Sequence, residues 1–329
     1  MSTSTRQRAT QITQATPSIR TFGSTRGVIA AVVLLAAHHA TQAVELLVPA
    51  YFYPSPDPAL SFWDELTAAS AAGAQITAII NPANGVGAAQ NADYVNAISS
   101  FKDAGGKVLG YAYTCYGGTR CTPGLPAAKS VADVVTEAAQ YASWYRVDGL
   151  FLDEMSNQAS DLPYYTDLAA TLRAQHPGWQ LVGNPGTATP AAYLNVADTL
   201  VTFERGTGSY LGAATEPWMT TADPSRQAHL HYNVADASQM RTLVSEAVAR
   251  RAGYLYITDD GAPNPWDRLP TYWNEELAAV NAANAVSAVP EPASVVLMLV
   301  GLATLGWRAK ARRSCGNAPS AARPAGCIG

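Results

Sequence analysis

The sequence predicts an α/β fold, a single (β/α)8 TIM barrel that spans about residues 44–285. Three observations predict it. Eight short apolar segments recur about once every thirty residues, and helix-length segments separate most of them. Many doubly wound sheets have a glycine-rich phosphate loop after the first strand, and none follows the first apolar segment here. Eight repeats without such a loop favour a closed barrel, and no domain boundary is visible inside it.

The eight apolar segments are the predicted strands. Each is rich in Val, Ile, Leu and Tyr and is bounded by polar residues, Gly or Pro, as buried strands are. The predicted strands are Leu46–Phe52, Ile76–Asn81, Lys107–Tyr113, Gly149–Glu154, Gln180–Asn184, Thr199–Glu204, Ala228–Tyr232 and Gly253–Thr258.

Helical spacing of apolar residues predicts helices in six of the connections. Five of them are 59–72, 91–104, 129–145, 237–251 and 271–283. In the sixth, Asp161 can cap the start, Pro163 suits the first turn, and Pro177-Gly178 ends the helix. The connection from 205 to 226 lacks this pattern, so we expect a long loop over one face.

The N-terminal segment predicts export. Residues 1–43 contain scattered arginines, an apolar run from Val28 to Ala37 and small residues up to Ala43, which together are typical of a secretory signal peptide. Cleavage after Ala43 would leave Val44 as the first mature residue. The alternative, a short membrane anchor or a buried helix, is less consistent with an apolar run this short.

The C-terminal segment carries a second targeting pattern. Val289-Pro290-Glu291-Pro292 precedes an apolar stretch at 293–307 and then a basic cluster ending at Arg313. The order resembles the PEP-CTERM sorting signal of Gram-negative bacteria, which implies processing by an exosortase. We therefore predict a sorting signal at 286–313, transient membrane contact through a short transmembrane helix at 293–307, and a tail of uncertain role at 314–329.

The charge distribution argues against a nucleic-acid partner. The chain of 329 residues has a formal net charge of −4 and only 14% charged residues, but its charges are segregated. Residues 1–43 and 293–329 hold nine basic residues and no acid, which leaves 12 Lys and Arg against 25 Asp and Glu in between. A domain this acidic suits a neutral or cationic substrate, although solubility alone would also account for it.

Two of the four cysteines, Cys115 and Cys121, lie six residues apart. In an exported protein this spacing favours a disulfide that pins one loop. A zinc site is less consistent with the sequence, because no histidine lies nearby and zinc-binding pairs are usually closer together.

The functional residues of a TIM barrel lie at the C-terminal ends of its strands. Here those positions are rich in carboxylates, amides and aromatic rings, and carboxylates come from the fourth, sixth and eighth strands. The expected catalytic acids are Asp153, Glu154 and Glu204. The expected substrate-binding residues are Tyr51, Tyr53, Asn81, Tyr111, Tyr113, Asn184, His231, Tyr232 and Asp259.

This mixture fits the hydrolysis of a glycosidic bond, which needs one protonated carboxyl group and one ionised carboxylate. The adjacent carboxylates Asp153 and Glu154 raise each other's proton affinity, and Glu204 could act from the opposite side of the bond. Tyrosine rings can stack on sugars, and asparagine side chains can hydrogen-bond sugar hydroxyl groups.

Other chemistries are less well supported. The residues that could ligate a divalent ion are Asp153, Glu154, His231 and Asp259. However, the H-x-H at 229–231 stands without a second histidine cluster and no H-E-x-x-H occurs, so we expect no metal and no cofactor. The sequence also contains no G-x-S-x-G, and the loop cysteines are assigned to the disulfide, so a Ser or Cys nucleophile is not expected.

Several dispersed segments resemble the spherulin 4 family. They are 47–54, Ile80-Asn81-Pro82, Gly110-Tyr111, 148–154, Asn184-Pro185-Gly186 and Phe203-Glu204. The resemblance covers about 44–283. Members characterised as enzymes form glycoside hydrolase family 135, which are barrels that cleave galactosamine-containing microbial polysaccharide. The resemblance implies that Asp153, Glu154 and Glu204 are the functional acids and that hydrolysis is endo-acting.

We therefore expect an exported, metal-independent glycoside hydrolase whose partners are extracellular polysaccharide, an exosortase and the export machinery, in the cell envelope or outside it. Two alternatives stay open. A non-catalytic barrel could bind polysaccharide as an envelope component and would tolerate the loss of a carboxylate. A metal-dependent hydrolase would bring His231 next to Asp259.

Overall fold

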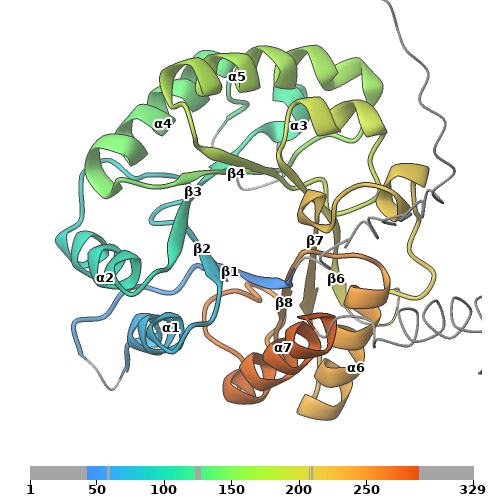
Figure 1. Cartoon of the computed structure of the whole chain (residues 1–329). Coiled ribbons are helices and arrows are strands. Elements are labelled where there is room, and N and C mark those ends of the chain that lie inside the picture. The colour runs from blue at the N-terminus through green and yellow to red at the C-terminus, as the bar shows by residue number, and fades with distance from the viewer. Residues whose placement is uncertain (1–42, 58–59, 123–126, 207, 209, 289–329) are drawn as a thin grey trace, which may run out of the picture. The chain divides into compact units, whose positions relative to one another are not determined.

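Eight parallel strands close into a barrel in sequence order, which confirms the predicted fold class (Figure 1). The computed structural model describes residues 43–57, 60–122, 127–206, 208 and 210–288. The strands are β1 (Glu45–Ala50), β2 (Ile76–Ile80), β3 (Lys107–Tyr113), β4 (Gly149–Asp153), β5 (Gln180–Gly183), β6 (Thr199–Gly206), β7 (Gln227–Tyr232) and β8 (Tyr254–Ile257). The pairing of β1 with β8 closes the barrel.

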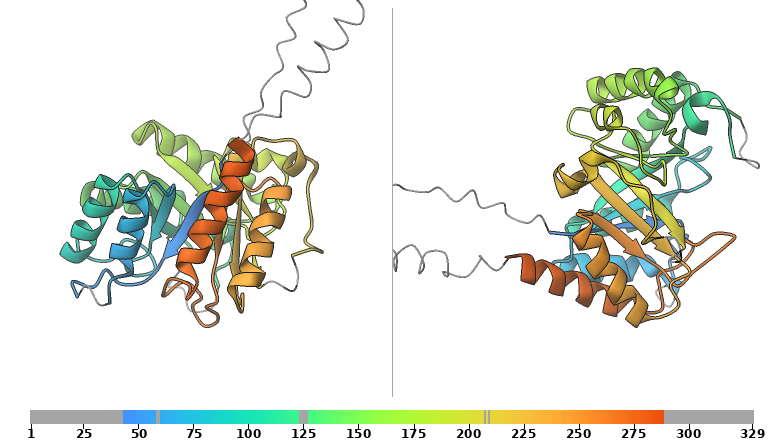
Figure 2. Two further views of the ribbon diagram at one scale, coloured as in Figure 1. Left: turned by 60° about the horizontal axis from the view of Figure 1, so that its bottom comes forward. Right: turned by 90° about the vertical axis from the view of Figure 1, so that its right-hand side faces the viewer.

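The described residues contain seven α-helices, of which six cover the outside of the barrel and the third, which is short, is a single turn after β3. They are α1 (Phe62–Ala71), α2 (Ala92–Asp103), α3 (Cys115–Gly118), α4 (Val131–Tyr145), α5 (Leu162–Gln175), α6 (Ala237–Ala249) and α7 (Trp273–Ala288). The last two lie side by side along the barrel wall in both views of Figure 2. None of the described helices is long and apolar enough to cross a membrane.

Two connections lack an α-helix in the part of the chain that the structure describes. The segment between β5 and β6 forms only the 3-10 turn Ala191–Asn195, and that between β6 and β7 forms Pro217–Thr220 and Pro224–Arg226. Prolines at or just before each turn fix the backbone but leave no amide to continue a helix. The predicted loop after residue 205 is therefore confirmed as mostly non-helical.

Helices α2 and α4 begin at residues whose side chains cap the helix, whereas the expected cap of α5 is absent. Ser130 forms a reciprocal capping box with Asp133 at the start of α4, and Asn91 caps α2. The expectation that Asp161 caps α5 is wrong. A 3-10 turn precedes that helix, and the Asp161 carboxylate accepts hydrogen bonds from Ser156 and Ser160 instead.

Close packing of helix on strand depends on small residues. At Gly110 in β3, an added Cβ would meet the Tyr141 ring at 2.6 Å, so only glycine allows α4 to lie this close. Tyr141 in turn donates a hydrogen bond to the carbonyl of Tyr111 at 2.9 Å. This contact fixes the C-terminal end of β3, where the candidate site begins.

The predicted terminal segments lie outside the described residues. They are the signal peptide up to residue 42, the sorting signal from 289, the membrane contact at 293–307 and the tail at 314–329.

Candidate active site

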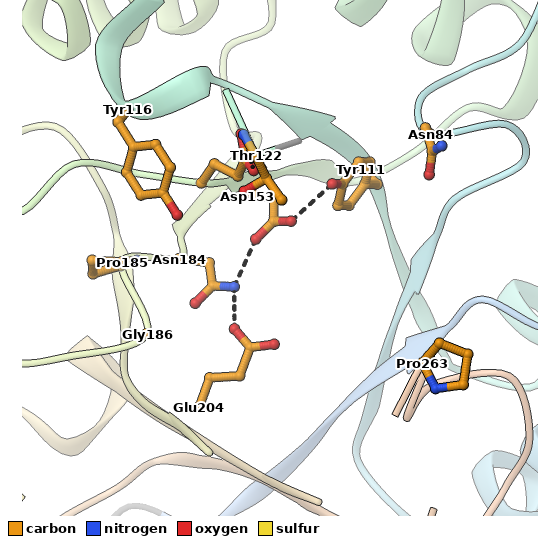
Figure 3. Close-up of a pocket in the computed structure, with 11 residues that line it drawn as sticks. Asn84, Tyr111, Tyr116, Thr122, Asp153, Asn184, Pro185, Gly186, Glu204 and Pro263 are labelled. Carbon is orange, nitrogen blue, oxygen red and sulfur yellow. Dashed lines mark hydrogen bonds between the residues drawn. The ribbon is translucent and has the colours of Figure 1, made fainter. Parts of the chain in front are cut away.

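A pocket of about 650 Å³ opens at the C-terminal ends of the strands (Figure 3). Residues from β3, β4 and β6 and from the loops that follow β2, β3, β4, β5 and β8 form its wall. The lining residues are Asn84, Tyr111, Tyr116, Thr122, Asp153, Glu154, Asn184, Pro185, Gly186, Glu204 and Pro263. All three predicted catalytic acids, together with Tyr111 and Asn184, therefore come together at one site.

A chain of hydrogen bonds joins two of the acids. Nδ2 of Asn184 donates to Oδ1 of Asp153 at 2.7 Å and to Oε2 of Glu204 at 2.5 Å (Figure 3). The hydroxyl of Tyr111 donates to the other oxygen of Asp153 at 2.8 Å. The two carboxyl groups thus share one amide donor, and Asp153 has a second donor of its own.

The backbone holds Asn184 rigidly between these acids. Its N–H donates to the carbonyl of Leu152 and its carbonyl accepts from the N–H of Met155, so both sides of the residue are tied to β4 and the turn after it. Gly186 then turns the chain with φ of +63°, and a Cβ there would lie 3.5 Å from Cβ of Glu204. Glycine suits both the positive φ and the close approach to β6.

The orientation of Glu154 differs from that of an ordinary strand residue. Side chains alternate between the two faces of a strand, so Asp153 and Glu154 would normally point in opposite directions. β4 ends at Asp153, and Glu154 adopts a left-handed conformation with φ of +49°. This turn directs its carboxylate into the same pocket, where Oε1 accepts a hydrogen bond from the Thr122 amide at 3.1 Å.

An irregularity in β6 precedes Glu204. The register with β7 shifts between Val201 and Phe203, so Thr202 is an extra residue in the strand. Bulges of this kind redirect the side chains that follow and are common beside active sites. Thr202 lies 3.1 Å from Nε2 of His229, which fixes the bulge against β7.

Burial raises the pKa of both paired acids. The pKa of Glu204 rises to about 7, because its surroundings exclude water and the charge of Asp153 lies close, while hydrogen bonds from Asn184 and Trp266 oppose the rise. Burial also raises the pKa of Asp153, but Tyr111, the Glu154 N–H and Asn184 all donate to its charged form. Three donors favour the anion at Asp153, so Glu204 is the member that holds the proton near neutral pH.

Tyr51 lies beside this site without lining the pocket. Its ring meets the edge of the Tyr111 ring at a centroid distance of 5.6 Å. Burial, followed by the charge of Asp153, raises the pKa of Tyr51 well above its usual value, so the phenol stays neutral. Its described contact supports the orientation of Tyr111.

Three other predicted binding residues have partners outside the pocket lining. The hydroxyl of Tyr53 bonds to Asp93 and Asn91 at the start of α2. Asn81 accepts a hydrogen bond from the Gly85 amide and so shapes the loop that carries Asn84. Tyr113 is buried beneath the ammonium group of Lys129, which lies 3.8 Å from the ring centre. Their geometry favours structural roles over substrate binding.

The residues predicted from the last two strands also lie outside the lining. His231 is fully buried between the rings of Phe203 and Tyr210, and burial lowers its pKa to about 3. Tyr232 packs edge-on against Trp266, which contacts Glu204.

Asp259 forms an ion pair with Arg268 at 2.7 Å and accepts from Thr271. His231 and Asp259 thus have separate partners, unlike the pair a metal-dependent hydrolase would need. Within the described part of the chain, no group of three or more His, Cys, Asp or Glu side chains is placed to hold a metal ion.

The structure adds lining residues that the sequence did not single out as ligands. They are Asn84, Tyr116, Thr122, Pro185, Gly186 and Pro263. Most belong to loops: Asn84 precedes Gly85, a pair typical of turns, and Pro185 and Gly186 belong to one of the segments that resemble the spherulin 4 family. Cys115 and Cys121 form a disulfide, which closes the loop that carries Tyr116 and ends next to Thr122.

Comparison with known proteins decides the family. The model of the spherulation-specific family 4 matches residues 45–280, almost the whole barrel. The chain belongs to this family. Spherulin-4 of Physarum polycephalum is 30% identical over 258 residues, which cover 74% of this chain and 72% of that protein. The crystal structure of Aspergillus clavatus Sph3 in complex with GalNAc has a similar fold, with a TM-score of 0.60 and 22% identity over 74% of this chain and 99% of that one.

A second match concerns the C-terminus of this spherulin 4 family member. The PEP-CTERM protein-sorting motif matches residues 288–313. This motif indicates export in a Gram-negative bacterium, to the cell envelope or beyond it, and implies processing by an exosortase.

Proposed function

We propose that this spherulin 4 family protein is an exported glycoside hydrolase that cleaves a galactosamine-containing polysaccharide at internal bonds. The observation that carries the proposal is the shared Asn184 amide, which holds the carboxyl groups of Asp153 and Glu204 together in an open pocket. One group of the pair holds a proton near neutral pH while the other is ionised, which is the arrangement that acid-assisted cleavage of a glycosidic bond needs.

In the proposed reaction, Glu204 is the general acid that protonates the leaving oxygen, and Asp153 is the anion that stabilises or attacks the sugar carbon. Each accepting oxygen lies within 2.7 Å of the same nitrogen, so these oxygens are within about 5 Å of one another. Carboxyl groups this close leave no room for a water molecule between sugar and base, which favours retention of configuration. Glu154 is a third acid at the same pocket.

The charge of the pocket supports an aminosugar. Its lining includes three carboxyl groups, two tyrosines and two asparagines, and no Lys, Arg or His is among the described lining residues. Such a surface attracts a cationic sugar, accommodates a neutral one and disfavours an anionic one. GalNAc in the complex of the similarly folded Sph3 is consistent with this substrate class.

The proposed reaction uses protein carboxyl groups alone and needs no metal or cofactor. We further propose that residues 1–43 are removed as a signal peptide, that 44–285 are the catalytic domain and that 293–307 contact the membrane transiently before sorting. N-terminal sequencing of the exported protein checks the first cleavage, for which Val44 is the expected start.

The test is release of reducing ends by the purified protein from three polymers: poly-N-acetylgalactosamine, its partly de-N-acetylated form and a neutral glucan. Release from a galactosamine polymer, with oligosaccharides rather than monosaccharides appearing first, supports an endo-acting hydrolase. Retention of the polymer without release would instead support the second candidate, a polysaccharide-binding envelope protein, for which the open tyrosine-lined pocket is the favourable observation. Activity on the glucan alone would contradict the aminosugar assignment.

A further inference from the structure

The segment that follows β3 is bonded to the backbone of two acids in the pocket. Oγ1 of Thr114 lies 3.0 Å from the carbonyl of Asp153 and 2.9 Å from that of Glu154. The Tyr116 amide donates to the Glu154 carbonyl at 2.8 Å. The start of this segment is therefore fixed to the end of β4.

The other end of the segment reaches the Glu154 side chain. Amides of Thr119 and Arg120 donate to the Cys115 carbonyl, each at 3.1 Å, and form a compact turn. Cys121 is then joined to the fully buried Cys115 by the disulfide. The next residue, Thr122, donates its amide to Oε1 of Glu154 at 3.1 Å.

The two oxygens of Glu154 consequently have different surroundings. Oε1 accepts from Thr122, whereas Oε2 is buried and has no hydrogen-bond partner among the described residues. A buried carboxylate oxygen without a donor is unfavourable unless a ligand supplies one. Glu154 lines the pocket, so the bond from the Thr122 amide to Oε1 is what fixes the orientation of its carboxyl group there.

Resting on the proposed function, we propose that the Cys115–Cys121 disulfide is a positioning element: it holds the Thr122 amide against Oε1 of Glu154 and so fixes the orientation of the Glu154 carboxyl group at the pocket. Glu154 acts on the substrate, and the disulfide acts through it. The hydrolase then reaches full activity only after export, because cysteines stay reduced in the cytoplasm and are oxidised outside it.

The redox step can be reversed with dithiothreitol. Its thiolate attacks the disulfide, the bond between Cys115 and Cys121 breaks, and both sulfurs end as thiols while the reagent closes to its cyclic disulfide. Two electrons and two protons pass to the protein. The predicted consequence is a lower kcat with little change in KM, because the polymer still reaches the pocket.

Three variants of the full chain separate the disulfide from general folding effects. Thr122→Pro removes the amide donor but retains the disulfide, Cys121→Ser removes the disulfide, and the control Thr136→Ala on the exposed face of α4 retains both. We expect kcat to fall roughly tenfold to a hundredfold in Thr122→Pro and Cys121→Ser, and to stay within about twofold of the parent in Thr136→Ala. In a Glu154→Gln background, Cys121→Ser should have no further effect, since the two act through the same group.

A second measurement does not depend on the enzymatic activity. Exchange of the Thr122 amide proton with solvent, followed by NMR, should be at least about tenfold faster in Cys121→Ser or after reduction than in the oxidised parent. Equal exchange would overturn the positioning role, and so would an additive loss of kcat in the Glu154→Gln background. An oxidised parent that protects the Thr122 amide but releases no reducing ends would contradict the proposed function and leave the positioning of Glu154 supported.

Discussion

Asp153 and Glu204 accept hydrogen bonds from a single atom, Nδ2 of Asn184, although they lie on β4 and β6. Because β5 lies between these strands, Asn184, the residue that directly follows β5, can reach both. Two carboxyl groups this close titrate as a pair, and the loss of the second proton is disfavoured by the charge left by the first. The pair therefore carries one proton over a range of pH, and the predictions below depend on that state.

The first prediction concerns the pH dependence of hydrolysis. Burial and the charge of Asp153 raise the pKa of Glu204 to about 7, and the acid is active only while protonated. We therefore expect kcat/KM to fall as pH rises through about 7. Tyr111→Phe removes a donor from Asp153, so the pKa of Asp153 should rise and the acidic limb of the profile should move to higher pH. A basic limb above pH 9 would exclude Glu204 as the acid.

The second prediction concerns the stability cost of Glu204. Its pKa in the folded protein is raised from 4.5 to about 7, so the folded state holds the proton more tightly than the unfolded state. The contribution of the protonated Glu204 to stability is therefore fully present below about pH 4.5 and is lost as pH rises through 7. Glu204→Gln should raise the free energy of unfolding by on the order of 2–3 kcal/mol at pH 8 and by almost nothing at pH 4. Urea unfolding at the two pH values checks this, and an equal gain at both would contradict it.

The third prediction concerns the backbone of Glu154. A non-glycine residue in the left-handed region is strained by roughly 1–2 kcal/mol. Glu154→Gly should relieve this strain, and the gain should offset the loss of the hydrogen bond from Thr122. The free energy of unfolding should therefore change by less than about 1 kcal/mol, while the rate of hydrolysis falls at least a hundredfold. The matched variant Glu154→Val keeps the strain and adds β-branching, and it should be less stable than the glycine variant by about 1–2 kcal/mol. Equal Tm values for the two variants would argue against the left-handed conformation of residue 154.

The fourth prediction concerns His231, which is buried beside Phe203 and Tyr210 without a hydrogen-bond partner among the described residues. Burial, with a smaller effect of Arg250, lowers its pKa from 6.5 to about 3. The unfolded chain therefore binds this proton more tightly, and stability is lost as pH falls below 6.5. His231→Leu should add about 2 kcal/mol at pH 5 relative to its effect at pH 8, as measured by denaturant unfolding. A gain independent of pH would mean that His231 does not titrate on unfolding.

The positions of the three acids could be predicted because strand ends follow from the sequence pattern. Apolar runs located the ends of the fourth and sixth strands, and barrel geometry then required Asp153 and Glu204 to face one edge. The side-chain directions could not be predicted in the same way. The left-handed turn at Glu154 and the bulge at Thr202 depend on tertiary packing, and neither leaves a local signal such as glycine.

Loop residues explain most of the remaining differences. Tyr53, Tyr113 and Asp259 lie at or after strand ends as expected, but Asp93 in α2, Lys129 just before α4 and Arg268 in the same loop as Asp259 engage them instead. Conversely, Tyr116 lies at the pocket with its amide bonded to the Glu154 carbonyl, and Thr122 follows the disulfide that closes the same loop. Contacts within and between loops have no periodicity, so a pattern of residues cannot reveal them.

The most direct test of the central claim compares the parent with Asp153→Asn and Glu204→Gln for release of reducing ends from a galactosamine polymer at pH 6. Each variant is isosteric, and Asp167→Asn on the exposed side of α5 is the matched control. The account predicts that both pocket variants fold, that each loses hydrolysis by about a thousandfold or more, and that the control retains the parent rate. Parent-like release by either folded pocket variant would contradict the assignment of Asp153 and Glu204 as the reacting pair.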